Sequence, residues 1–200
     1  ITARLNGTPF VQQPTVTIVP AAVSAPASTA AIPAATAGVQ TTITIQAKDQ
    51  FGNNLTTGGA TVMVSVAGAN SVAQFAAADN TNGTYTAQYT PTVAGTDGIT
   101  ITLGGNPISG SPYSSVVSAA ALSTFLVEAS GGGAIGTQTA GTPFSIRITA
   151  QDASGNTITT FGGTGNTVTL SSTGTLQGLP PILTGNFVNG VITHSVTLTE

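Results

Sequence analysis

Few residues of this chain carry side chains suited to acid–base or nucleophilic chemistry. Its 200 residues include three Lys and Arg, six Asp and Glu, one His and no Cys. The histidine, His194, has the same strand phase as Ile192 and Val196, so we expect it to face a core. A catalytic histidine needs an acid or a nucleophile within hydrogen-bond reach, and the sequence identifies none. We therefore predict no catalytic residues and expect that the chain is not an enzyme.

Metal ions and cofactors are also not expected. Ca²⁺ takes about six to eight oxygen ligands, several of them from converging carboxylates. No two acidic residues lie closer than 18 positions apart, although Asp49 and Glu128 would be the first candidates if a site existed. The string Gly131-Gly-Gly-Ala-Ile-Gly136 fits the dinucleotide pattern G-x-G-x-x-G, which binds a pyrophosphate only where a helix follows. Thr137 to Pro143 lead into a strand pattern instead, so a flexible loop is predicted.

Covalent modification offers a third kind of site. The sequence holds three Asn-x-Ser/Thr sequons, at Asn6, Asn54 and Asn82, and all three fall in predicted turns. A glycan could project from each turn in a eukaryotic secreted protein. We therefore keep Asn6, Asn54 and Asn82 as possible glycosylation sites.

The composition limits the partners that the surface can bind. Charged residues make up 4% of the chain, the net charge is −3, and Thr and Ser supply about a quarter of the residues. Nucleic-acid binding requires clustered Lys and Arg, so no nucleic-acid partner is expected. Thr, Pro and Gly interrupt the apolar stretches well before the ~20 residues of a membrane span, so no membrane insertion is expected.

The residues that position these side chains follow a period of two. Short runs alternate apolar with Thr, Ser or Gln and end at Gly, Pro, Asn or Asp, as antiparallel strands do. Examples include Ile43/Ile45/Ala47, Val62/Val64/Val66, Tyr85/Ala87/Tyr89, Ile99/Ile101/Leu103, Phe144/Ile146/Ile148 and Val168/Leu170. Asn82-Gly83 is a hairpin-turn signal, because both residues tolerate φ > 0. The Ala-rich stretch Pro20–Gly38 contains Pro26 and Pro33, which favours extended chain over helix.

Two internal registers reveal repeats of about a hundred residues. Ile99 to Pro107 aligns without gaps on Ile1 to Pro9, an offset of 98, and the match continues to Val117 on Val19. A second register, with an offset of 103, links Ala47-Lys-Asp49…Gly52-Asn53 to Ala150-Gln-Asp152…Gly155-Asn156. Asp49 and Asp152 each end a strand, where a carboxylate can accept backbone N–H bonds in the turn.

These registers predict tandem immunoglobulin-like antiparallel β-sandwich domains, an all-β fold. We expect residues 1–20 to be the C-terminal hairpin of a preceding repeat, 21–118 a complete repeat, and 119–200 a repeat without its last strands. Two explanations remain open. The chain is a window from a longer array, or residues 1–20 of one copy complete residues 119–200 of another, as in strand donation.

Residues 45–117 resemble a filamin-type immunoglobulin-like repeat. The matching pieces are Ala47 to Asn53, Asn82 to Gly95 and Gly105 to Tyr113. Residues 135–200 resemble the immunoglobulin-like (invasin/Big-type) repeats of bacterial surface proteins, through Thr139-Ala-Gly-Thr-Pro-Phe144 and Ala150-Gln-Asp-Ala-Ser-Gly-Asn156.

The resemblance implies a seven-stranded sandwich that serves as a spacer, filament segment or binding module. In filamin repeats a peptide can add a strand beside the third and fourth strands, here approximately Thr61–Ala67 and Val72–Phe75. Animal filamins are cytoplasmic and more highly charged, so an actin-crosslinking role is not carried over.

The sequence therefore predicts a structural segment of an extracellular filament, stalk or surface adhesin. The alternatives are a peptide- or glycan-binding module, or a non-catalytic spacer attached to a secreted enzyme. The expected partners are other copies of the chain or neighbouring repeats, and a host or matrix surface. The expected location is extracellular or at the cell surface.

Overall fold

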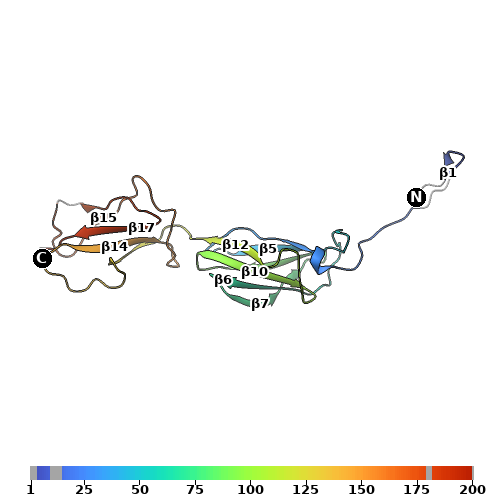
Figure 1. The fold of residues 1–200 in the computed structure, drawn as a ribbon, viewed down its shortest axis with the longest axis horizontal. Helices are drawn as coiled ribbons and strands as arrows, with labels where there is room; N and C mark the ends of the chain where they lie inside the picture. The colour runs from blue at the N-terminus through green and yellow to red at the C-terminus, as the bar shows by residue number, and fades with distance from the viewer. Residues whose placement is uncertain (1–3, 10–14, 179–181, 200) are drawn as a thin grey trace.

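The computed structural model describes residues 4–9, 15–178 and 182–199. Two all-β units follow one another along an elongated molecule, and a small hairpin lies apart at the N-terminal end (Figure 1). Regular helix among the described residues is limited to one 3₁₀ turn, η1 (Ala25–Ala27). The expectation of an all-β fold is thus confirmed.

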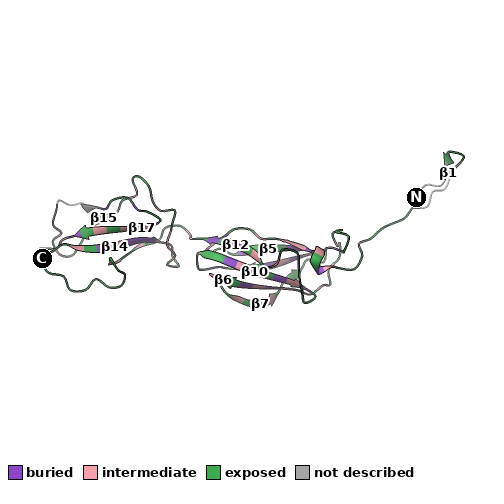
Figure 2. Ribbon diagram, in the orientation of Figure 1, coloured by how far each residue is buried: buried purple, intermediate pink, exposed green. Residues whose placement is uncertain are grey.

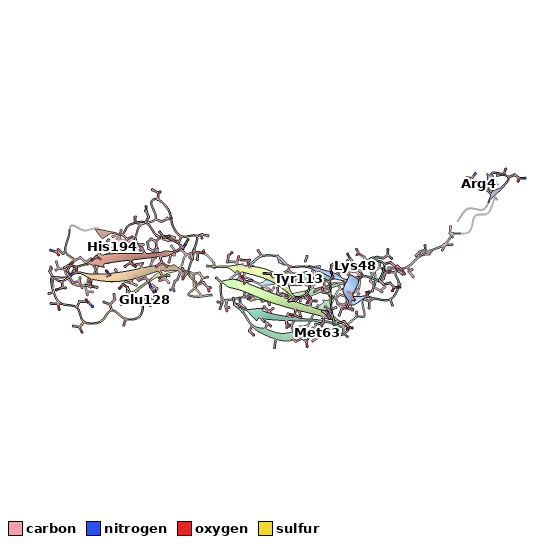
Figure 3. The ribbon with its side chains drawn as sticks, in the orientation of Figure 1. Arg4, Lys48, Met63, Tyr113, Glu128 and His194 are labelled. Atoms are coloured by element: carbon pink, nitrogen blue, oxygen red, sulfur yellow. The ribbon has the colours of Figure 1, made fainter. Side chains whose placement is uncertain are left out.

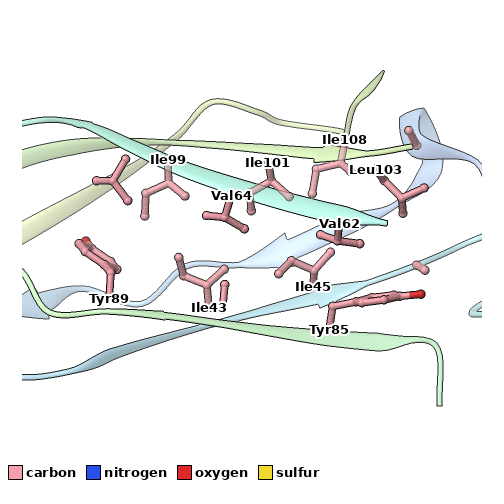
Figure 4. Packing of buried hydrophobic residues seen from close by; sticks show 14 residues of the cluster. Ile43, Ile45, Val62, Val64, Tyr85, Tyr89, Ile99, Ile101, Leu103 and Ile108 are labelled. Carbon is pink, nitrogen blue, oxygen red and sulfur yellow. The ribbon is translucent and has the colours of Figure 1, made fainter. Parts of the chain in front are cut away.

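The first unit is a sandwich of two sheets. One sheet contains, in order, β3 (Thr29–Ala31), β5 (Thr41–Gln46), β9 (Thr84–Tyr89) and β8 (Ala78–Asp79). The other contains, in order, β4 (Ala35–Thr36), β12 (Tyr113–Ser118), β10 (Gly95–Leu103), β6 (Val62–Gly68) and β7 (Val72–Ala76), with β11 (Asn106–Pro107) paired to β10. Neighbouring strands are antiparallel except β12 and β4. Figure 4 shows the two layers with the core between them.

Alternation of side chains builds this core. In β5, Ile43 and Ile45 are fully buried while Thr42 and Thr44 are exposed. In β10 the inward residues Ile99 and Ile101 meet them from the opposite sheet (Figure 4). Because successive residues of a strand point to opposite faces, this pattern fixes which face of each sheet is inside.

The second unit has a three-stranded sheet and a smaller strand pair. The sheet contains, in order, β13 (Thr124–Ala129), β14 (Phe144–Gln151) and β17 (Val191–Val196), and the pair is β15 (Thr169–Leu170) with β16 (Ile182–Leu183). The buried hydrophobic side chains of its core cluster are Ile146, Ile148, Phe187 and Val196. Phe125, Phe161 and Phe187 surround one another with ring-centroid separations of 4.9–5.7 Å.

The N-terminal hairpin reproduces a hairpin of the first sandwich. In β1 (Arg4–Leu5) and β2 (Thr8–Pro9), Arg4 pairs with Pro9. At an offset of 98, Thr102 pairs with Pro107. The two turns also have matching left-handed residues, with φ of 52° and 83° at Asn6-Gly7 and 57° and 83° at Gly104-Gly105. The first internal register therefore corresponds to a repeated local structure, although positions 1–3 and 10–14 of the predicted segment 1–20 lie outside the described residues.

Three expectations need adjustment. Pro20–Gly38 is mostly extended as predicted, but it includes η1, in which Pro26 occupies the first turn. The turn predicted at Asn82-Gly83 is present before β9, but positive φ occurs there at Thr81 (61°) and Gly83 (82°). Asn82 has a different role there, because its Oδ1 accepts hydrogen bonds from the N–H and hydroxyl of Thr84.

The third adjustment concerns strand addition. Strand β6, which corresponds to the predicted Thr61–Ala67, already pairs with β10 on one side and β7 on the other. A peptide therefore has no free edge there. Strand β7, which contains the predicted Val72–Phe75 segment, has an edge without a strand partner among the described residues.

Candidate functional site

One aspartate organises a tight turn in each unit. The turn follows β5 in the first unit and β14 in the second. The Oδ1 atom of Asp49 accepts the backbone N–H groups of Phe51 and Asn53, both at 2.9 Å. Its Oδ2 atom accepts the backbone N–H of Ala21 and the side-chain amide of Asn53, also at 2.9 Å. The carboxylate thus ties the chain entering the sandwich to the end of β5.

Asp152 repeats this geometry atom for atom in the second unit. Its Oδ1 accepts the N–H groups of Ser154 and Asn156, and its Oδ2 accepts the N–H of Ala120 and the side-chain amide of Asn156, all at 2.9 Å. The sequence prediction that both aspartates accept backbone N–H bonds in a turn is borne out by this geometry. Because these oxygens are already hydrogen-bonded, neither aspartate is oriented as a metal ligand.

The hydrogen bonds favour the ionised form of both carboxyl groups. The side-chain amide of Asn53, assisted by backbone N–H groups, lowers the pKa of Asp49 to about 2. Burial alone would raise the pKa of Asp152, but its hydrogen bonds from Ala120, Asn156 and Ser154 prevail and lower it to about 2. Hydrogen bonding to a charged form stabilises that form.

Asn156 joins the two sandwiches. Its Oδ1 accepts the backbone N–H of Ala94 at 2.8 Å, and its amide nitrogen donates to the carbonyl of Thr92 at 2.8 Å. Both partners belong to the loop between β9 and β10 of the first unit. A groove of about 540 Å³ lies at this junction, lined by residues 94–96, 116–119 and 156–160. One side chain thus organises a turn in the second unit and binds a loop of the first.

The loop that binds Asn156, between β9 and β10, is stabilised by a buried polar pair. Asp97 is fully buried, and its carboxylate accepts the backbone and side-chain N–H groups of Asn70 at 2.7–3.2 Å. Asn70 in turn binds the backbone of Thr92 and Val93 through its Oδ1 at 2.8 and 3.0 Å. Buried polar groups must be hydrogen-bonded, and here that requirement fixes the shape of the loop.

Tyr89 completes this network from the facing sheet. Its hydroxyl donates to Asp97 at 3.2 Å. Burial raises the pKa of Tyr89 above its ordinary value, and the neighbouring Asp97 charge raises it further, so the hydroxyl stays protonated and donates. In the sequence Asp97 is an isolated acid. Its partner, Asn70, lies 27 positions away, and no local pattern links the two.

The remaining charged residues and His194 are spread along the molecule. Figure 3 shows Arg4, Lys48, Glu128 and His194 distributed over its length. Within the described residues no three His, Cys, Asp or Glu side chains come together to hold a metal ion. Glu128 binds Arg147 at 2.7 Å instead, and this ion pair lowers the pKa of Glu128.

The remaining predicted positions are placed as follows. His194 is half-buried on the same face of β17 as Val196. Residues 131–136 lie between strands β13 and β14, and no helix follows them. Asn6, Asn54 and Asn82 are exposed, and their glycosylation stays a prediction. No helix in the described part of the chain is long and apolar enough to cross a lipid bilayer.

Comparison with known proteins supports the resemblance found in the sequence. Residues 20–114 match the model of the filamin/ABP280 repeat, and this range spans most of the first sandwich. No curated protein sequence matches the chain significantly.

Among solved structures, FdeC, an Escherichia coli adhesin, superposes with a TM-score of 0.55 at 24% identity, covering 98% of this chain and 63% of that one. Invasin, a bacterial integrin-binding protein, superposes with a TM-score of 0.51 at 19% identity, covering all of this chain and 39% of that one. This chain is thus similar in fold to parts of two longer bacterial proteins, an adhesin and an integrin-binding protein.

Proposed function

We propose that this chain is a spacer segment of an extracellular stalk or surface adhesin, built from immunoglobulin-like repeats joined end to end. In this proposal residues 21–118 and 119–200 are successive repeats, and residues 1–20 belong to a preceding one. The chain acts mechanically, by holding a binding region at a distance from its anchor, and not by catalysis.

The observation that carries the proposal is the hydrogen-bonded junction at Asn156. A flexible linker would leave two sandwiches free to reorient, whereas two backbone bonds from one side chain restrain their relative angle. The low charge of the chain also suits repeats packed in series, because little electrostatic repulsion separates them. The fold shared with the adhesin FdeC and with invasin supports an extracellular or cell-surface location.

Small-angle X-ray scattering of the 200-residue chain tests the proposal. We expect an elongated particle whose profile fits the end-to-end arrangement of the two units in Figure 1. Asn156→Ala should shorten and broaden the distribution of interatomic distances, because the junction loses both bonds. Asn53→Ala is the matched control, because it alters the equivalent turn of the first unit, which lies away from this junction. A compact profile for the unsubstituted chain would contradict the spacer function.

Contact between copies is a second candidate function, favoured by the N-terminal hairpin. Strands β1 and β2 reproduce the register of β10 and β11. Among the described residues β15 pairs with β16 alone, so its other edge has no strand partner. The hairpin of one copy would then pair with β15 of another. Light scattering over a range of concentrations decides this. Concentration-dependent oligomers that disappear when residues 1–19 are deleted would support strand donation, whereas a monomer at all concentrations would exclude it.

A further inference from the structure

The first sandwich contains a turn, residues 49–53, with the same geometry as the turn of residues 152–156 that lies at the junction. At an offset of 103, the backbone bonds of the two turns correspond. Asp49 N–H donates to the Asn53 carbonyl and Asp152 N–H to that of Asn156, each at 3.0 Å. Gly52 and Gly155, the left-handed residues of these turns, have φ of 84° and 82°. The side-chain amide bond from asparagine to aspartate is 2.9 Å long in both turns.

The two asparagines differ in what their outward atoms bind. Asn156 is half-buried, because its Oδ1 and its amide reach the loop of the preceding sandwich. Asn53 is exposed, and its Oδ1 has no hydrogen-bond partner among the described residues. The Asn53 side chain thus presents its Oδ1 and the second N–H of its amide in the same backbone frame, and in the described part of the chain only Asp49 is bound to that amide.

We infer that the Asn53 turn is a docking site for the loop of a preceding repeat that corresponds to residues 92–94, with Asn53 bound to one carbonyl and one N–H of that loop. This inference rests on the proposed spacer function. The ligand is a short stretch of backbone whose carbonyl and N–H lie two residues apart, as in Thr92 and Ala94.

The length of the connecting chain supports this occupant. Val117 corresponds to Val19, and the N–H groups of Ala120 and Ala21 make the same bond to their aspartates. Two residues separate Val117 from Ala120, and one separates Val19 from Ala21. Because each residue spans at most about 3.6 Å, a repeat that ends at Val19 is connected to the Asn53 turn by a segment with a shorter maximum reach than the segment between the first sandwich and the Asn156 turn.

The surface around Asn53 also fits a covered junction. Phe51, in the turn itself, is 73% exposed, and Val23, which forms a β-bridge with Asp49, is 36% exposed. Large apolar side chains gathered near one end of a soluble domain indicate a contact surface. The residue of the second turn that corresponds to Phe51 is Ser154, so a junction at Asn53 would bury more apolar area than the junction at Asn156 does.

The test uses the 200-residue chain with residues 20–117 duplicated in tandem, so that Val117 of the first copy precedes Pro20 of the second. The chain has no Cys, so Thr42→Cys in both copies provides two unique positions for spin labels. Electron–electron double resonance then measures the distribution of distances between the copies. The reference is the Thr42→Cys, Ser145→Cys pair in the 200-residue chain, which spans the existing junction at equivalent, exposed positions.

We expect the duplicated chain to give a distribution as narrow as the reference. Asn53→Ala in the second copy should widen it, because the loss of two hydrogen bonds raises the undocked population at least about tenfold. The same substitution in the first copy is the matched control and should leave the width unchanged.

A broad distribution in the unsubstituted duplicated chain would overturn the inference, and so would equal widening by both substitutions. Scattering on the same sample separates the two proposals. An extended particle with a broad distribution refutes docking at Asn53 and leaves the spacer function standing, whereas a compact particle refutes the spacer function.

Discussion

The two sandwiches share a turn but differ in how completely their cores are closed. In the first, fourteen hydrophobic side chains from both sheets form one buried cluster (Figure 4). In the second, four do so among the described residues, and Phe125, Phe144 and Phe161 around them are partly exposed. Figure 2 shows buried positions alternating with less buried ones along the strands of the first unit, as in β5 and β6.

The difference is traceable to one strand. In the first sandwich β10 places Ile99, Ile101 and Leu103 against β5 and β9, and it pairs with both β6 and β12. The corresponding side of the second unit consists of the short strands β15 and β16. A sandwich is stable only when both sheets bury their inner faces, so the second unit depends more on its cluster of phenylalanines. Local turn geometry is therefore retained where global packing is not.

The largest effect is expected where a turn of the first sandwich leaves no space. A Cβ at Gly83 would lie 1.9 Å from the carbonyl oxygen of Leu55, at a φ of +82°. Gly83→Ala should cost about 4 kcal/mol of unfolding free energy in the first unit, measured by urea denaturation. Gly190 is the counterpart, with its nearest contact at 2.5 Å, and Gly190→Ala should cost less.

Gly105→Ala separates strain from steric clash in this prediction. Gly105 has a φ of 83°, but a Cβ added there would have no atom within 4 Å, so only the backbone strain of about 1 kcal/mol applies. Equal losses for Gly83→Ala and Gly105→Ala would show that the contact with Leu55 relaxes freely.

The next effect compares equivalent core residues. Ile45 and Ile148 both have no exposed surface, but Ile45 belongs to a cluster of fourteen buried hydrophobic residues, whereas the cluster of Ile148 has four among the described residues. Ile45→Ala should cost about 4 kcal/mol and Ile148→Ala about 2 kcal/mol, because a looser core collapses more easily around a cavity. Each loss should appear in the transition of its own unit during denaturation. Equal losses would mean that the second core is as tightly packed as the first.

Local periodicity predicted the strands, but it could not predict which residues far apart in the chain would pair. The alternation of Ile43 and Ile45, and of Ile146 and Ile148, appears in the structure as buried faces of β5 and β14. The turns at Asp49 and Asp152 were also predictable, because an aspartate that accepts N–H groups two and four residues ahead is a local pattern.

The functional part of each turn was not predicted. Asn156 binds a loop 62 and 64 positions earlier in the chain, and no hydrophobic or turn pattern encodes such a contact. The internal register displayed the shared spacing of Asp49/Asn53 and Asp152/Asn156. Because each side-chain amide donates to the aspartate of its own turn, this spacing indicates the turn and not the contact with another unit. Burial of Asp97 likewise depends on Asn70, from another strand connection.

A smaller effect tests whether the two turns contribute equally in acid. The pKa of both Asp49 and Asp152 is about 2 in the folded chain, against an ordinary value of 3.8. A carboxyl group whose pKa is lowered by folding stabilises the fold fully above its ordinary pKa and loses that contribution as pH falls toward the lowered value. Both units should therefore lose stability between about pH 4 and pH 2.

Urea midpoints measured across this pH range check the prediction. Asp49→Asn should reduce the acid dependence of the first transition alone, and Asp152→Asn that of the second alone. If either substitution altered both transitions, the turns would be coupled through the junction at Asn156, and the two units would not unfold independently.

The smallest effect is expected from the ion pair that the second unit has and the first lacks. Glu128 and Arg147 lie directly opposite each other on β13 and β14, whereas the corresponding pair on β3 and β5 is Ala31 and Thr44. Glu128→Gln keeps an acceptor for the Gly133 N–H but removes the charge. Because the pair is partly exposed, the midpoint of the second transition should fall slightly at low ionic strength and be unchanged at about 1 M salt, where the Debye length is about 3 Å. A loss that persists at high salt would mean that Glu128 stabilises the second unit through its hydrogen bonds, and that the thinner core relies on polar contacts where the first sandwich relies on β10.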